Sequence, residues 1–170
     1  MSSATDLLVD AFDRVQEVSR AAVADLDEQQ LTARLDADAN SIAWLVWHLT
    51  RVQDDHVSAL AGQEQVWISG GWADRFALPF PLDGIGYGQS SADVAKVHDI
   101  PTDLLVGYQD EVHDMTVEYV GALSAADLAE VVDENWDPPV TAAVRLVSVV
   151  SDTLQHAGQA AFVRGILLRR

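Results

Sequence analysis

The stretch SIAWLVWHLTRVQDDHVSALA, residues 41–61, predicts a long helix with one buried face. Its apolar side chains recur every three or four positions and would form a single buried arc that includes Leu45, Leu49 and Val52. Asn40 or Ser41 can cap the N-terminus, because a short polar side chain accepts a hydrogen bond from the first helical turn. Gly62 suits the left-handed residue that commonly ends a helix, so we expect the helix to stop there.

Helical periodicity continues on both sides of this stretch. It predicts three further long helices and one short helix, over residues 4–28, 101–123, 141–168 and 124–132. Pro101 can open the third long helix, because the first helical position needs no N–H donor. No segment alternates apolar and polar residues as a half-buried strand would. We therefore expect an all-α fold, a four-helix bundle that forms one domain over residues 1–170.

Composition limits the function classes. The chain has 170 residues and a formal net charge of −17, which argues against nucleic acid and against anionic membrane surfaces as partners. No apolar run is long enough to span a membrane, and the start MSSATDLLVD lacks the segments of a signal peptide, so we expect a cytoplasmic protein. Cysteine is absent, so any thiol chemistry needs a thiol from another molecule.

A long connection, residues 63–100, separates the second and third long helices. It is rich in glycine and holds five of the twelve aromatic residues, namely Trp67, Trp72, Phe76, Phe80 and Tyr87. Such a segment can cover one end of a bundle, line a pocket there and exclude water, or it can simply plug that end. In the first interpretation four of these aromatics contact substrate, together with Trp44 of the preceding helix: Trp67, Trp72, Phe76 and Tyr87. The run GIGYG, residues 84–88, is interpreted as a turn, because no strand-to-helix setting surrounds its glycines.

The last long helix contains VRLVSVVSDTLQHAGQAAFV, residues 144–163, which is apolar nearly all round and predicts a buried helix. Asp152 and His156 lie four residues apart on it and form a polar stripe with Ser148, Gln155 and Gln159. Burying a carboxylate is costly unless the group is paired or binds a metal. The pair is therefore interpreted either as a hydrogen-bonded couple at a bundle seam or as two ligands that reach one metal ion.

The position of His48 favours the interpretation of Asp152 and His156 as two ligands of one metal ion. It lies at the edge of the buried arc of residues 41–61, with Trp44 on its flank, and would complete a set of two histidines and one carboxylate with Asp152 and His156. Three protein ligands leave coordination positions open, as catalytic metal sites do. Asp55 is interpreted either as the acceptor that fixes the tautomer of His48 or as a surface acid beside Arg51.

Three other histidines are considered. His56 competes with His48 for the ligand role, because it lies nearer the middle of the apolar arc. His98 and His113 are interpreted as non-ligands, because neither has a partner at ligand spacing. Gly158, next to His156, would allow a second helix to approach the ion.

Two blocks of sequence resemble the DinB/YfiT-like metal-binding helical bundles, a family that includes thiol-dependent S-transferases and mycothiol-dependent maleylpyruvate isomerase. The blocks are WHLTRVQDDH, residues 47–56, and DTLQHAGQAAFVRG, residues 152–165. His48 matches the first metal ligand of the family, and Asp152 with His156 matches the ligand pair at four-residue spacing. The chain departs from the family at Asp152, where many members have histidine and the isomerase branch has glutamate.

The resemblance implies a metal-dependent transferase that joins a low-molecular-weight thiol, such as mycothiol, to a small electrophile. Zinc is the first expectation for the metal, with nickel, iron or manganese as alternatives, and a homodimer is implied as well. Asp55 or Gln159 would orient the ligands or relay a proton. Two alternatives stay open at this point: a thiol-dependent isomerase of the maleylpyruvate type, and a metal-binding stress-response bundle without turnover.

Overall fold

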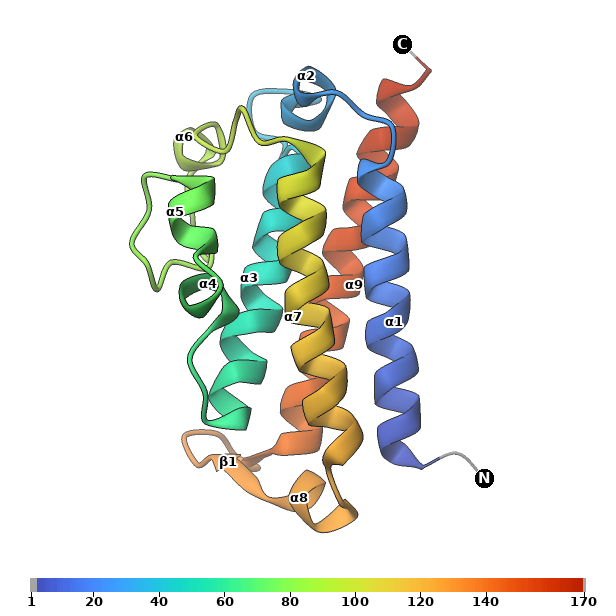
Figure 1. Cartoon of the computed structure of the whole chain (residues 1–170), viewed down its shortest axis with the longest axis vertical. Helices are drawn as coiled ribbons and strands as arrows, with labels where there is room; N and C mark the ends of the chain where they lie inside the picture. The colour runs from blue at the N-terminus through green and yellow to red at the C-terminus, as the bar shows by residue number, and fades with distance from the viewer. Residues whose placement is uncertain (1–2, 170) are drawn as a thin grey trace.

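The computed structural model describes residues 3–169, and four long helices lie side by side in it (Figure 1). These helices are α1 (Ala4–Val23), α3 (Ile42–Ala61), α7 (Thr102–Ala122) and α9 (Ala142–Leu167). Both α1 and α3 pack against α7 and against α9. The chain is mostly helical, which broadly fits the predicted all-α fold.

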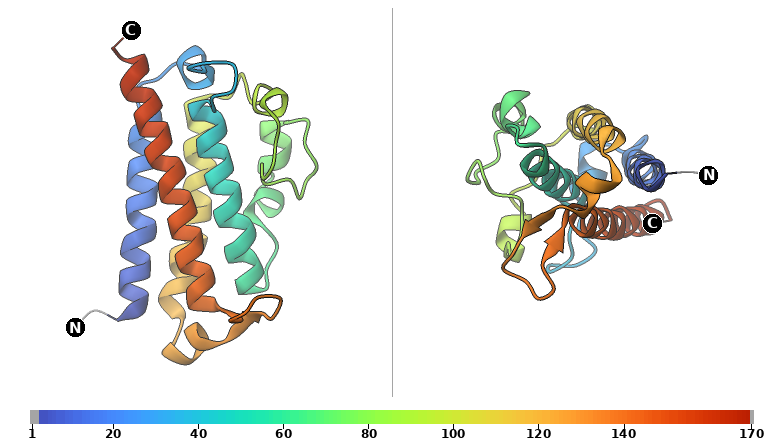
Figure 2. Two further views of the ribbon diagram at one scale, coloured as in Figure 1. Left: turned by 180° about the vertical axis from the view of Figure 1, so that it is seen from behind. Right: turned by 90° about the horizontal axis from the view of Figure 1, so that it is seen from below.

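Short elements join the long helices. They are α2 (Glu28–Thr32), α4 (Val66–Ser69), α5 (Trp72–Phe76), α6 (Ser91–Val94), α8 (Ala125–Ala129), β1 (Val131–Asp133) and β2 (Val140–Thr141). The two strands pair antiparallel and form a small hairpin at the end of the molecule where α9 begins (Figure 2). The sequence did not predict this hairpin, because strands of three and two residues are too short to produce a periodic pattern.

Two helix boundaries correct the sequence prediction. The helix expected over residues 4–28 ends at Val23, and Ala24 is already extended. A separate helix then begins after Asp27, whose side chain accepts a hydrogen bond from the backbone N–H of Gln30 and thereby caps α2. The short helix expected over residues 124–132 ends at Ala129, because the chain turns into β1 at Val131.

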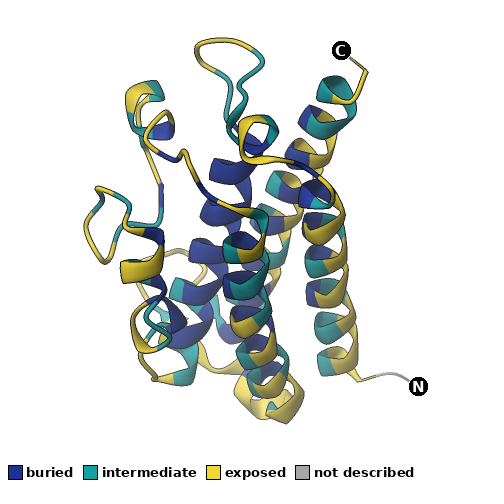
Figure 3. Ribbon diagram, turned by 45° about the horizontal axis from the view of Figure 1, so that its top comes forward, coloured by how far each residue is buried: buried dark blue, intermediate teal, exposed yellow. Residues whose placement is uncertain are grey.

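The core lies around α3, which is the most buried of the long helices (Figure 3). Its Trp47 and Leu49 are at most 1% exposed, as are Tyr108 of α7 and Leu146 of α9. The arc predicted for residues 41–61 is thus buried, and the burial extends over nearly the whole circumference of α3 through residue 54. This central helix is the one that carries His48.

The prediction that the last long helix is buried all round is wrong. In the described chain α9 buries one face against α1 and α3 and exposes apolar side chains on the other: Val144, Val147, Leu154 and Phe162, between 43% and 66% exposed. An apolar composition alone does not distinguish a buried helix from one with an exposed apolar face. Asp152 and His156 therefore lie at the boundary of the buried face and are partly exposed.

The connection over residues 63–100 lies along the side of the molecule, beside α3 and α7 (Figures 1 and 2). Contacts of α4 with α3 and α7, and of α5 with α7, hold it there. Both interpretations of this segment placed it at an end of the bundle, and this placement is corrected by the arrangement. The expectation that the segment lines a pocket holds for Ile85 and Tyr87. Among residues 3–169, no helix is long and apolar enough to cross a membrane.

Candidate metal centre

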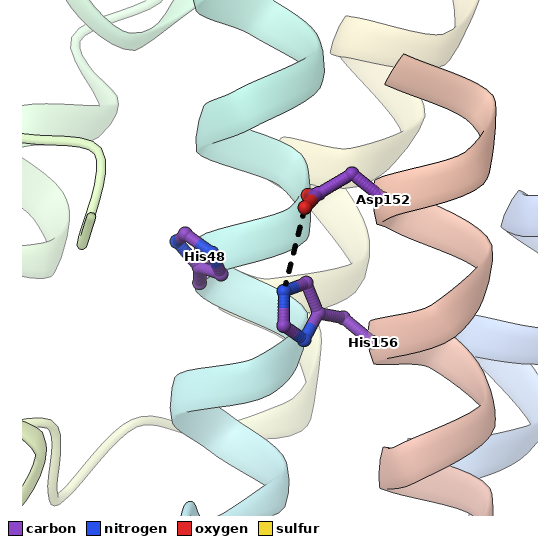
Figure 4. A group of neighbouring side chains, drawn as sticks. All are labelled: His48, Asp152 and His156. Atoms are coloured by element: carbon purple, nitrogen blue, oxygen red, sulfur yellow. Dashed lines mark ion pairs between the residues drawn. The ribbon is translucent and has the colours of Figure 1, made fainter. Parts of the chain in front are cut away.

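Three side chains from α3 and α9 converge on one point: His48, Asp152 and His156 (Figure 4). One potential ligand atom from each of them lies within 4.8 Å of the others. The two helices run in opposite directions, and a position in the first half of α3 faces the middle of α9 (Figure 1). Two imidazole nitrogens and one carboxylate oxygen form a donor set that suits a divalent transition metal.

His48 is held in one tautomer by the backbone. The side chain is 5% exposed, and its Nδ1 donates to the carbonyl oxygen of Ile85 at 2.5 Å. Because a carbonyl oxygen only accepts, Nδ1 carries the proton and Nε2 keeps its lone pair for a metal. Burial is the main cause that lowers the pKa of His48, which favours the neutral imidazole that metal binding requires.

Asp152 and His156 do not form the hydrogen-bonded couple that was one interpretation of their spacing. The distance from Asp152 Oδ1 to His156 Nε2 is 3.7 Å, which is too long for a hydrogen bond. The other carboxylate oxygen, Oδ2, is shielded from solvent and has no hydrogen-bond partner. A shielded carboxylate oxygen without a donor fits a metal ligand, since a cation would satisfy it.

Gln159 orients His156 in the way that Ile85 orients His48. Its Oε1 accepts from His156 Nδ1 at 2.9 Å, which again leaves Nε2 free. Both histidines therefore direct an unprotonated Nε2 away from their hydrogen-bond acceptors. Asp55, the other residue predicted to orient a ligand, accepts instead from Gln65 Nε2 at 2.7 Å. The acceptor for His48 is a backbone carbonyl, which no side-chain pattern can reveal.

One face of α3 holds the loop that supplies this carbonyl, residues 82–89. Trp44 Nε1 donates to Gln89 Oε1 at 2.7 Å, and Arg51 Nε donates to the carbonyl oxygen of Gly84 at 3.3 Å. With His48 between them, these side chains lie four and three residues apart on one helix face. The loop is therefore fastened to α3 at three points, with His48 in the middle.

Arg51 is fully buried, contrary to the interpretation that places it beside a surface acid. Its guanidinium lies 3.4 Å from Asp54 Oδ2 and donates to the hydroxyl oxygen of Tyr108 at 3.1 Å. Asp54 in turn accepts from the backbone N–H groups of Val66 and Trp67 at 2.9 and 2.7 Å. The buried pair of Arg51 and Asp54 thus anchors two segments: the beginning of the long connection, and the loop of residues 82–89 that contacts His48.

Gly86 allows the loop to approach His48 closely. Its φ is +91°, and a Cβ placed there would lie 2.7 Å from His48 Nδ1 and 3.0 Å from Trp47 Cζ3. Any side chain at this position would collide with the imidazole. The predicted turn over residues 84–88 is consistent with the structure, but nothing in the sequence indicates that this turn contacts His48. A run of glycines next to an aromatic residue was the only available signal.

The five aromatic residues predicted to contact substrate divide into two groups. Trp44 stacks on His48 with ring centroids 4.6 Å apart, and Tyr87, 90% exposed, lines a cavity of about 240 Å³ beside His48 and Asp152. The other three pack around Tyr108 in the core and are each 4% exposed: Trp67, Trp72 and Phe76. The structure does not bring these three to the candidate metal centre.

The remaining histidines lie outside the group of His48, Asp152 and His156. His56 lines the cavity next to His48 and lies 3.6 Å from Asp55 Oδ2. His113 pairs with Asp13 at 3.0 Å, and His98 is exposed beside Asp99. Gly158 faces open space, so the expected close approach of a second helix at that glycine is wrong.

Comparison with known proteins identifies a family and a similar solved structure. A family model described as mycothiol-S-transferase matches residues 7–168. The chain is also similar to a solved structure titled "Crystal structure of the conserved protein of locus from Enterococcus faecalis", with a TM-score of 0.92 and 30% sequence identity over 100% of both chains. The comparison with curated proteins found no match.

Proposed function

The chain belongs to the mycothiol-S-transferase family, and on that premise we propose that it transfers a low-molecular-weight thiol to a small electrophile at a divalent metal ion. The ion would be held by His48, Asp152 and His156, with zinc as the first candidate because zinc accepts nitrogen and carboxylate ligands in a tetrahedral site. The observation that supports the proposal is the convergence of these side chains, whose ligand atoms lie within 4.8 Å of one another.

When bound, the divalent ion supplies Lewis acidity that lowers the pKa of a thiol and gives a thiolate at neutral pH. In the overall reaction the sulfur forms a bond to the electrophilic carbon, the thiol proton passes to solvent, and the displaced group leaves with the bonding electron pair. The chain itself has no cysteine, so the sulfur comes from the cosubstrate.

The residues of the chain prepare the site. Ile85 and Gln159 hold the two imidazoles in the tautomer with a free Nε2, so the ligand set needs little reorganisation. Trp44 covers one face of His48 and excludes water from that side. Tyr87 is exposed at the mouth of the cavity, where it can contact an incoming electrophile.

The test combines metal analysis with a conjugation assay. Purified protein should contain about one divalent ion per chain, and His156→Ala should lose it. The metal-loaded protein should consume mycothiol in the presence of a panel of alkylating electrophiles and give a thioether, whose mass is that of the two reactants less the displaced group and the thiol proton. A product with the mass of the electrophile alone would instead indicate an isomerase. Metal binding without thiol consumption would indicate a metal-binding bundle with no turnover.

A further inference from the structure

A further cavity, of about 540 Å³, lies where the N-terminal end of α3 meets the second half of α9. Its polar side chains are three carboxamides, those of Asn40, Gln155 and Gln159, so we call it the amide cavity. Leu45 and Phe162 are among its apolar lining residues. The candidate metal ligands do not line the amide cavity, so it is a separate site from the metal centre.

The lining of the amide cavity is uncharged, although charged residues make up 22% of the chain. Within the described part of the chain, no Asp, Glu, Lys, Arg or His side chain lines it. A charged ligand would lose water there without gaining a counter-ion, which is costly. Leu45 is buried beneath the cavity, whereas the ring of Phe162 is exposed and can stack on a flat apolar ring. The cavity therefore suits an uncharged ligand that contains such a ring.

The two glutamines of α9 offer complementary hydrogen-bonding atoms. Gln155 donates from Nε2 to the carbonyl oxygen and the Oγ of Ser151 at 3.0 and 3.3 Å, which leaves its Oε1 to accept. Gln159 accepts from His156 through Oε1, which leaves its Nε2 to donate. The glutamines lie four residues apart and are neighbours on the helix surface. A carboxamide of a ligand has one carbonyl oxygen and one NH₂ group, so it can meet both of them.

We propose that the amide cavity binds an uncharged ligand in which a carboxamide adjoins a flat apolar ring, and that an occupied cavity strengthens metal binding. Gln159 links the two sites, because it lines the cavity and also accepts from Nδ1 of His156 at 2.9 Å. Its side chain is exposed, so without a ligand it is free to leave the imidazole. A ligand that accepts from Gln159 Nε2 holds the side chain in place, and metal binding then costs less ordering of His156. This inference uses the candidate metal centre but no thiol chemistry.

The first experiment measures binding of small probes to the zinc-loaded, isotope-labelled protein by nuclear magnetic resonance titration. Benzamide combines the ring with the carboxamide, benzoate replaces the carboxamide by a charged group, and acetamide lacks the ring. Benzamide should bind at least about tenfold more tightly than either of the others. The side-chain amide signals of Asn40, Gln155 and Gln159 should shift on binding, which locates the probe without any substitution.

Gly158→Leu tests the location independently. Gly158 lines the cavity, and a Cβ there would meet nothing within 4 Å, so a leucine fills the cavity without a collision. Leucine also favours a helix interior more than glycine does, so the variant should fold. Its affinity for benzamide should fall at least about tenfold. Gly121→Leu is the matched control and should keep the wild-type affinity, because Gly121 is an exposed glycine of α7 with open space around it, outside the cavity.

Competition with a zinc chelator tests the coupling between the two sites. Saturating benzamide should lower the zinc dissociation constant about fivefold, and zinc should lower that of benzamide by the same factor, because coupling between two binding events is reciprocal. In Gln159→Ala the zinc dissociation constant should not respond to benzamide. A response in that variant would overturn Gln159 as the link.

The remaining outcomes are equally decisive. Failure of benzamide to bind, equal affinity for benzoate, or unchanged benzamide affinity in Gly158→Leu would overturn the amide cavity as a ligand site. Benzamide binding that leaves the zinc affinity unchanged would overturn the coupling. If the protein sediments as a dimer that Gly158→Leu alone converts to a monomer, a second copy covers this face and the ligand site is overturned. Because no thiol or electrophile is present, failure of the proposed transferase function would leave these results intact.

Discussion

The carbonyl oxygen of Ile85 lies 2.5 Å from Nδ1 of His48, so a turn distant in sequence sets the protonation and the direction of a candidate metal ligand. The turn keeps this position because one face of α3 fastens it on both sides, through Trp44 and Arg51. A ligand whose orientation is fixed before the ion arrives binds it with a smaller entropic cost.

Gly86→Ala should weaken zinc binding. The new Cβ would lie 2.7 Å from His48 Nδ1, so the imidazole or the turn must move, and we expect the zinc dissociation constant to rise about 10- to 100-fold. Gly88→Ala is the matched control, because Gly88 also has a positive φ, of +68°, but its Cβ would meet nothing within 4 Å. Competition with a zinc chelator measures the zinc dissociation constants of both variants. Equal losses in the two variants would show that backbone strain, and not contact with His48, causes the effect.

Gln159→Ala should also weaken zinc binding, by about tenfold, because His156 loses the acceptor that fixes its tautomer. Gln159→Glu keeps a side-chain oxygen at that position and should restore most of the affinity. Gln159 is exposed, so neither change should lower the unfolding midpoint appreciably. The same chelator competition checks the result, and an Ala variant with wild-type affinity would remove Gln159 from the site.

Arg51→Met should destabilise the fold strongly. It removes a fully buried guanidinium and leaves the Asp54 carboxylate buried without its cation, so we expect a loss of about 3–5 kcal/mol in the free energy of unfolding. Arg14→Met is the control, since Arg14 pairs with Asp10 on the exposed surface of α1, where we expect a much smaller loss of stability. Urea denaturation measures the free energy of unfolding of both variants. Similar losses would mean that the buried pair does not anchor the long connection.

The sequence predicted the parts of the site that depend on helical periodicity. The spacing of Asp152 and His156, and the place of His48 beside a buried arc, follow from 3.6 residues per turn and need no knowledge of the loops. Gln159 could be named for the same reason, since it lies on the same helix as His156. The long helices were found because each repeats an apolar pattern over several turns.

The parts that the sequence did not reveal depend on tertiary contacts of the irregular segment over residues 63–100. A backbone carbonyl such as that of Ile85 has no side-chain signature, and Asp55 was considered because it is near in sequence. The core aromatics Trp67, Trp72 and Phe76 look the same in sequence whether they line a pocket or pack around Tyr108. Side-chain type alone therefore overestimated how many of them contact substrate.

His48 should make the stability of the metal-free protein depend on pH. Burial is the main cause that lowers its pKa below the usual 6.5, so below pH 6.5 the unfolded chain binds a proton at this residue more readily than the folded chain. The contribution of neutral His48 to the free energy of unfolding is complete above pH 6.5 and is lost as the pH falls from 6.5 through the lowered pKa.

The variant His48→Gln removes this contribution. The exposed carboxylates are the same in the wild-type protein and the variant, so their effect cancels when the two free energies of unfolding in urea are subtracted. The free energy of unfolding of the wild type minus that of the variant should decrease as the pH falls through that window. A difference that stays constant or increases would show that the buried imidazole is not held neutral in the fold.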